Sequence, residues 1–161
     1  MKINAIDIVQ LRAMQEQLKA DPAAGDKAPA VTVRWLGGGS AEATMGERKM
    51  LIGGEGNLNA MQGLLASLGA CDIDVILMHA ALQGLTIEDL RIEASGTFNT
   101  AGFYGATAQD PAYKQITYTV YLKAPGATSE QLEYLKERCE QFSPVGNSLK
   151  VPLTFSIEIV R

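Results

Sequence analysis

Near the start of the chain, apolar residues recur at the spacing of a helix. Soon afterwards, apolar and polar residues alternate as they do in strands. The spacing predicts one helix over residues 1–21, in which Asn4 is the expected N-cap and Asp7 lies in the first turn. Asp21-Pro22 is expected to end it. The positions that share its apolar face are Ile8, Leu11, Met14 and Leu18. Residues 22–30, rich in Ala, Gly, Asp and Pro, then form a linker to a core over residues 31–161.

Alternation of apolar and polar residues marks the strands of that core. Val31, Val33 and Trp35 alternate with polar residues, so residues 31–35 predict a strand with one buried face. Weaker strand patterns follow at residues 41–44 and 48–52. Further strands are expected over residues 87–96 and 115–123. A last one is predicted from Val151, Leu153, Phe155, Ile157 and Ile159.

Residues 60–82 are apolar on nearly every side, which predicts a helix buried on all sides. Asn59 is its expected cap and Gly84 its stop. The stretch is nearly long enough to span a bilayer, but Asp72 and Asp74 near its middle favour a helix buried inside protein.

A second helix over residues 129–142 completes the pattern, with capping-box spacing between Thr128 and Gln131. Its apolar face comprises Leu132, Leu135, Cys139 and Phe142, and a turn follows at residues 143–147. Strands outnumber crossover helices, so we predict an α+β fold with largely antiparallel sheets. One such sheet cannot cover the long helix on every side, which predicts an intimate homodimer.

Composition and charge narrow the class of protein. With 161 residues, 47% hydrophobic and 20% charged, the chain fits one globular domain. A net charge of -4, a pI of about 5.0 and the lack of a basic stripe argue against nucleic acid as a partner. The N-terminus has no apolar leader, so we expect a cytoplasmic protein with reduced thiols.

Cys71 is the first candidate for chemistry, because a thiol on a central helix is either inert and buried or activated by a nearby cation. Asp72 and Asp74 disfavour a thiolate, so Arg34 or Arg48 would have to approach it.

The pattern gives the remaining candidate residues less support for a chemical role. Cys139 fits a core position, and the single histidine, His79, is expected to be packed and satisfied, too far along the helix for a Cys/His pair. We expect no metal site and no cofactor, and the glycine runs at Gly37 and Gly53 are turns. Asp7, Asp21 and Glu42 are expected to be solvated, without a functional role.

Two ordered motifs resemble those of the OsmC/Ohr family. Residues 59–71, Asn-Ala-Met-Gln-Gly-Leu-Leu-Ala-Ser-Leu-Gly-Ala-Cys, resemble the family's cysteine helix. Residues 142–149, Phe-Ser-Pro-Val-Gly-Asn-Ser-Leu, resemble its second signature. The strand ending in Trp35-Leu36-Gly37-Gly38 is similar to one subgroup of OsmC-like proteins.

The resemblance implies an intertwined dimer and a thiol peroxidase acting on organic hydroperoxides in oxidative stress defence. A first cysteine, here Cys71, becomes a sulfenic acid, a second cysteine forms a disulfide with it, and dithiols restore the enzyme. An Arg stabilises the thiolate and a Glu holds that Arg.

This chain departs from the pattern at three positions. Met61 replaces the Glu, Ser143 replaces the second cysteine as in the similar subgroup, and the usual Arg position falls near Gly39. Arg34 is therefore a substitute candidate. Cys139, about one helical turn before Ser143, is a candidate resolving thiol.

Three functions stay open at this point. The first is the peroxidase with Cys71 as nucleophile. The second is a non-catalytic dimer that binds a small apolar or thiol-reactive ligand, and the third is a structural or stress-associated dimer with an inert Cys71.

Overall fold

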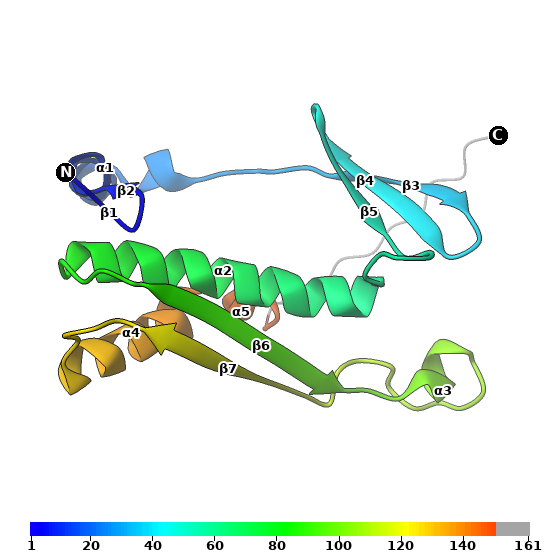
Figure 1. Cartoon of the computed structure of the whole chain (residues 1–161). Coiled ribbons are helices and arrows are strands. Elements are labelled where there is room, and N and C mark those ends of the chain that lie inside the picture. Colours follow the sequence, from blue (N-terminus) through cyan, green and yellow to red (C-terminus); the bar gives the residue numbers. More distant parts are fainter. Residues whose placement is uncertain (151–161) are drawn as a thin grey trace.

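The computed structural model describes residues 1–150 of the chain, so the strand predicted over residues 151–159 lies outside the described residues. All strand pairs are antiparallel and helices pack beside them, which confirms the α+β class. Figure 1 shows the long helix α2 (Ala60–Leu82) between the remaining elements.

The N-terminus folds as a short hairpin before its helix begins. Strands β1 (Lys2–Ile3) and β2 (Ile6–Asp7) precede α1 (Ile8–Ala20), so the prediction that Asn4 caps the helix is wrong. Asn4 and Ala5 instead form the hairpin turn, with φ of +53° and +64°. The Asn4 amide also bonds the Leu85 carbonyl and the Ile87 N–H at 3.0 and 2.9 Å, which ties the hairpin to the end of α2.

Asp7 provides the cap that the sequence pattern assigned to Asn4. Its carboxylate accepts hydrogen bonds from the N–H groups of Gln10 and Val9, and these bonds lower the pKa of Asp7. Asp7 therefore caps α1, a contribution to the fold that was expected of Asn4. Asp21 ends α1 as predicted, and a short 3-10 helix, η1 (Pro22–Gly25), follows.

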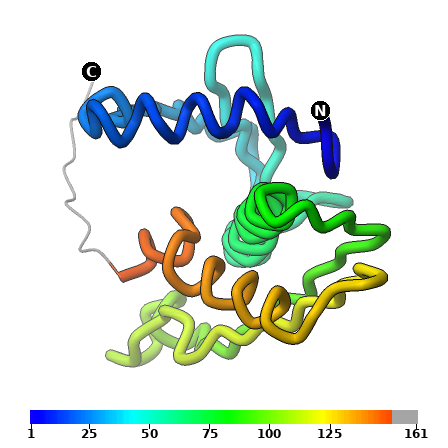
Figure 2. The backbone as a smooth tube through the Cα atoms, turned by 90° about the vertical axis from the view of Figure 1, so that its left-hand side faces the viewer, coloured from blue at the N-terminus to red at the C-terminus, as the bar shows by residue number. Residues whose placement is uncertain are grey.

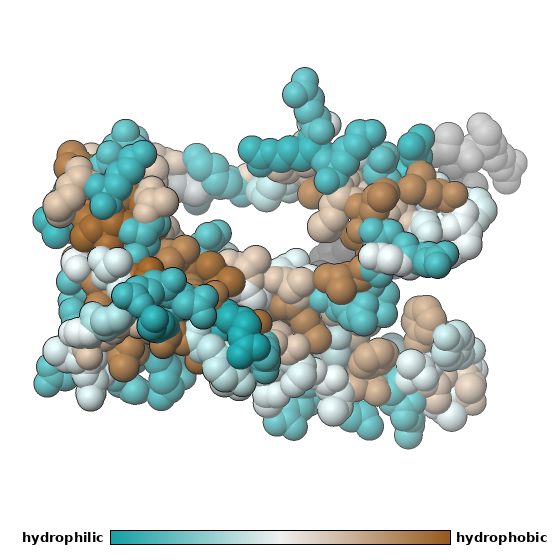
Figure 3. Space-filling view, in the orientation of Figure 1, coloured by the Kyte–Doolittle hydropathy of each residue, from teal (hydrophilic) through white to brown (hydrophobic). Residues whose placement is uncertain are grey.

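Strands β3 (Thr32–Gly37), β4 (Ser40–Met45) and β5 (Arg48–Ile52) form one antiparallel sheet, close to the predicted bounds. The predicted buried face of β3 is wrong within one chain, because Val31 and Val33 are exposed and Trp35 is 74% exposed. No described element of the same chain covers that side of this edge strand. Figure 3 shows hydrophobic residues on the surface of this region and along α2.

Helix α2 begins as the sequence predicts, with a complete capping box between Asn59 and Gln62, and Gly84 follows its last turn. The buried residues are Leu68, Gly69, Asp72, Val75, Ile76, Ala80 and Ala81. Within one chain, one side of the N-terminal half of α2 lacks a covering element, as expected for a sheet that cannot cover the long helix on every side, and burial on all sides by a second copy stays a prediction. Two cavities of about 560 and 500 Å³ border that side, and both are lined by Leu58, Ala66 and Ala70.

The other side of α2 packs on a second layer. Strands β6 (Asp89–Thr97) and β7 (Gln115–Lys123) form a hairpin whose connection contains α3 (Thr100–Phe103). Helix α4 (Ser129–Phe142) runs below α2 in Figure 2 and carries the predicted Thr128–Gln131 capping box. The core comprises Val75, Ile76, Ala80, Leu85, Leu135 and Cys139.

Two expectations for the C-terminal part need correction. Leu132 and Phe142, predicted on the buried face of α4, are 44% and 51% exposed, because the contact with α2 covers a narrower stripe. The expected turn after α4 is a short helix, α5 (Pro144–Ser148), capped by Ser143.

Candidate functional site around Cys71

Cys71 lies at the middle of α2 and is partly exposed, so the residue is neither fully buried in the core nor fully open on the surface. Within residues 1–150, the hydrogen bond that reaches this sulfur comes from the Ser143 hydroxyl, at 3.7 Å. Both cysteines are free thiols. The structure therefore brings Cys71 and Ser143, the two predicted motif positions, into contact.

Ser143 is held rigidly by its place between two helices. Its side chain is almost fully buried, and its N–H donates to the Cys139 carbonyl at 3.2 Å. Its hydroxyl oxygen accepts from the Gly146 N–H at 3.1 Å, which caps α5 and leaves the hydroxyl hydrogen for Cys71. Ser143 thus supplies a fixed hydrogen-bond donor to Cys71.

Cys139 lies in the core of α4, as expected for a core cysteine, and is 5% exposed. Burial raises its pKa to about 12, and the nearby charges of Asp72, Cys71 and Glu140 act in the same direction. The Cys139 thiol is therefore protonated near neutral pH.

Asp72 is the most unusual residue of the site. Its side chain is fully buried, and neither carboxylate oxygen accepts a hydrogen bond within residues 1–150. Burial, and then the neighbouring Asp72 carboxylate, raise the pKa of the Tyr118 phenol. Asp74, two residues further along α2, is exposed, so the two carboxylates differ completely in environment. The sequence contained a signal for the burial of Asp72. It lies four residues from both Leu68 and Ile76 and therefore shares their face of α2.

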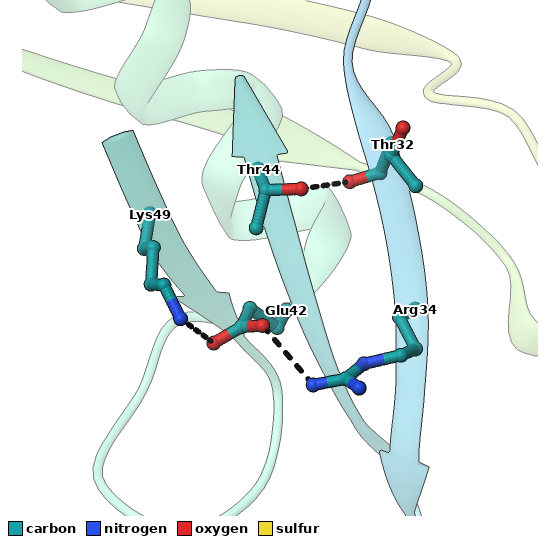
Figure 4. Close-up of polar contacts among 5 residues, drawn as sticks. All are labelled: Thr32, Arg34, Glu42, Thr44 and Lys49. Atoms are coloured by element: carbon teal, nitrogen blue, oxygen red, sulfur yellow. Dashed lines mark hydrogen bonds and ion pairs between the residues drawn. The ribbon is translucent and has the colours of Figure 1, made fainter. Parts of the chain in front are cut away.

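Arg34 is not brought to Cys71 within one chain. Figure 4 shows its guanidinium directed at Glu42 on the adjacent strand, with Nη2 and Oε1 3.3 Å apart. The other Glu42 oxygen bonds the Lys49 ammonium at 3.4 Å. The Glu42 side chain is only 16% exposed, so the expectation that it is solvated is wrong. Arg48, the other candidate, is exposed at the start of β5.

His79 is packed and satisfied, as predicted. Its Nδ1 lies 3.1 Å from the Tyr134 hydroxyl, and its ring stacks on Phe142 with centroids 6.0 Å apart. The Arg138 guanidinium lies over the same two aromatic rings. Burial and then the Arg138 charge lower the pKa of His79 below its ordinary value of 6.5.

This shift predicts a loss of stability on acidification. The folded state resists protonation of His79, so its full contribution is present above about pH 6.5 and is lost as the pH falls from there toward the lowered pKa. We expect the urea midpoint of the wild type to fall between about pH 7.5 and about pH 5.5. In His79→Gln this fall should be smaller, and an equal fall in both proteins would contradict the assignment.

Within residues 1–150, no three His, Cys, Asp or Glu side chains are grouped so as to hold a metal ion. One described helix, α2, is long and apolar enough to cross a membrane by length and composition alone. Its packing against α4 and β6, with Asp72 fully buried, supports its interpretation as a core helix.

The sequence of the site also matches a known family. The family model described as OsmC-like protein matches residues 53–158, which include Cys71, Cys139 and Ser143. The chain belongs to the OsmC-like family. No curated protein sequence matches the chain.

Solved structures support the OsmC-like fold. An OsmC-like protein from Mycoplasma pneumoniae is 17% identical, with a TM-score of 0.67, over 78% of this chain and 89% of that one. A hypothetical protein from Aquifex aeolicus VF5 is 18% identical, with a TM-score of 0.63 over the same shares. An organic hydroperoxide resistance protein OsmC from Legionella pneumophila is 19% identical, with a TM-score of 0.53, over 77% and 90%. At these identities the similarity shows the fold.

Proposed function

We propose that this OsmC-like protein is a thiol-dependent peroxidase that reduces organic hydroperoxides through Cys71, in oxidative stress defence. The observation that carries the proposal is the partly exposed Cys71 sulfur with a fixed hydroxyl donor, Ser143, beside it. The thiolate is the form of a cysteine that attacks peroxides, and the Ser143 hydroxyl is placed to donate to that sulfur. The similarity to the Legionella pneumophila hydroperoxide resistance protein is consistent with this substrate class.

The proposed reaction has two steps on the protein. The Cys71 thiolate attacks the terminal peroxide oxygen, the O–O bond breaks, and the alkoxide takes a proton to leave as an alcohol, so Cys71 becomes a sulfenic acid. Cys139 then attacks the Cys71 sulfur, an S–S bond replaces the S–O bond, and water leaves. A dithiol reductant, as expected in the cytoplasm, reduces the disulfide and restores both thiols.

A second copy of the chain completes the proposed site. The uncovered side of α2 and the exposed apolar residues of β3 are the surfaces that a homodimer would bury. In that assembly we assign the cation to Arg34 of the second copy. Glu42 holds its guanidinium in place, a role that Met61 at the family's usual glutamate position cannot perform.

The rate of thiol loss tests this function. Cumene hydroperoxide should oxidise Cys71 at least about a hundredfold faster than it oxidises free cysteine, and faster than hydrogen peroxide does. Cys71→Ser should abolish the fast phase, whereas the matched Cys139→Ser variant should retain it. A rate equal to that of free cysteine would reject the peroxidase.

That negative result would favour the alternative, a non-catalytic dimer that binds a small apolar or thiol-reactive ligand. The observation behind it is the pair of cavities along α2, whose lining includes Leu58, Ala66 and Ala70. Thermal stabilisation by apolar ligands without any thiol loss would then identify this second function.

A further inference from the structure

A small cavity lies beside the buried Asp72 side chain, and the proposed peroxidase assigns no role to Asp72, although Ser143 and Cys139 also line this cavity. This cavity has a volume of about 210 Å³, and the polar groups of Asp72, Tyr118 and Ser143 line it. Leu68, Ile116 and Leu149 provide apolar walls. A polar group buried without hydrogen bonds raises the free energy of the folded chain, so a partner for the Asp72 oxygens would lower it.

A larger apolar groove adjoins the cavity between α4 and β7. Its volume is about 710 Å³, and it shares Tyr118, Cys139 and Glu140 with the smaller cavity. The remaining walls are mostly aliphatic and comprise Ile76, Val120, Leu122, Leu132 and Leu135. The two spaces together offer a carboxylate at one end and an aliphatic surface leading away from it.

The cations near these spaces are engaged elsewhere. Lys150 lines the cavity, but its ammonium bonds the Asn147 side chain at 3.1 Å. Lys136 lines the groove and pairs with Glu133 at 3.0 Å. The Arg138 guanidinium lies over the Tyr134 and Phe142 rings. Among residues 1–150, no salt bridge reaches Asp72.

We propose that this composite pocket binds an amphipathic cation, a primary ammonium group on an aliphatic chain. The ammonium donates to the Asp72 carboxylate and has the Tyr118 and Ser143 hydroxyls as further acceptors. The aliphatic chain lies in the groove between α4 and β7, where it removes apolar surface from water. Because Ser143 also contacts Cys71, the bound head group lies beside the thiol site without requiring its reaction.

Octylammonium is the probe for this site, and calorimetric titration of the full-length protein is the measurement. We expect it to bind, whereas octanoate, which has the same chain and the opposite charge, should not. Asp72→Asn should weaken octylammonium binding at least about tenfold, because the amide cannot pair with the cation. Asp74→Asn, which removes an exposed carboxylate two residues away, should leave binding unchanged.

A second variant tests the groove independently of Asp72. Leu132→Trp places a large ring at the partly exposed edge of the groove and should weaken octylammonium more than butylammonium. Cys71→Ser should bind octylammonium like the wild type, so loss of the peroxidase and loss of this site are distinguishable. Equal binding of octanoate, or equal affinity in Asp72→Asn, would overturn the proposal.

Discussion

Once Cys71 has been oxidised, its disulfide with Cys139 is expected to form about ten times faster for each pH unit gained between about pH 7 and about pH 9. The attacking species is the Cys139 thiolate. Burial, with Asp72, Cys71 and Glu140, raises the pKa of Cys139 to about 12, so the thiolate is a small fraction throughout this range. Far below a pKa, each added pH unit multiplies that fraction tenfold.

Sequential mixing separates this step from the first oxidation. One equivalent of cumene hydroperoxide is added, the pH is then changed, and intact mass is followed with time. The wild type should first gain an oxygen and then reach a net loss of two hydrogens. Cys139→Ser should keep the oxygen at every pH. Disulfide formation that is independent of pH, or absent altogether, would remove Cys139 as the resolving thiol.

Leu135→Ala is expected to lower the free energy of unfolding by about 2–5 kcal/mol. Leu135 is 3% exposed and belongs to the core cluster with Val75, Ile76 and Cys139, where α4 packs on α2. The substitution removes buried methyl groups and leaves a space that two packed helices can close only in part.

Leu132→Ala is the matched control for this substitution. Leu132 lies one helical turn earlier on α4 and is 44% exposed, so its truncation should cost less than about 1 kcal/mol. Urea unfolding at one fixed protein concentration measures both variants, because the proposed homodimer would make apparent stability depend on concentration. Equal destabilisation by Leu135→Ala and Leu132→Ala would mean that the buried contact between α2 and α4 does not stabilise the fold more than an exposed position of α4 does.

The apolar pattern predicted the bounds of both long helices, α2 from a long apolar run between a cap and a glycine, and α4 from apolar residues three and four positions apart. The caps at Asn59 and Thr128 were also predictable, since each depends on a partner three residues away. The same local reasoning gave the wrong cap for the first helix. Asn4 and Asp7 are both good caps by type, and the contact of Asn4 with Leu85 and Ile87, far along the chain, selected Asp7.

The sequence by itself determined the α+β class, the position of Cys71 on a central helix and the match of Ser143 to the second family motif, because these depend on local spacing. Only the tertiary structure decided that Ser143 contacts Cys71, that Asp72 is buried while Asp74 is exposed, and that Glu42 holds Arg34. The physical reason is that burial and polar contact depend on which elements pack together. Residues 71 and 143 meet because α4 and α5 pack on α2, and no local pattern specifies that geometry.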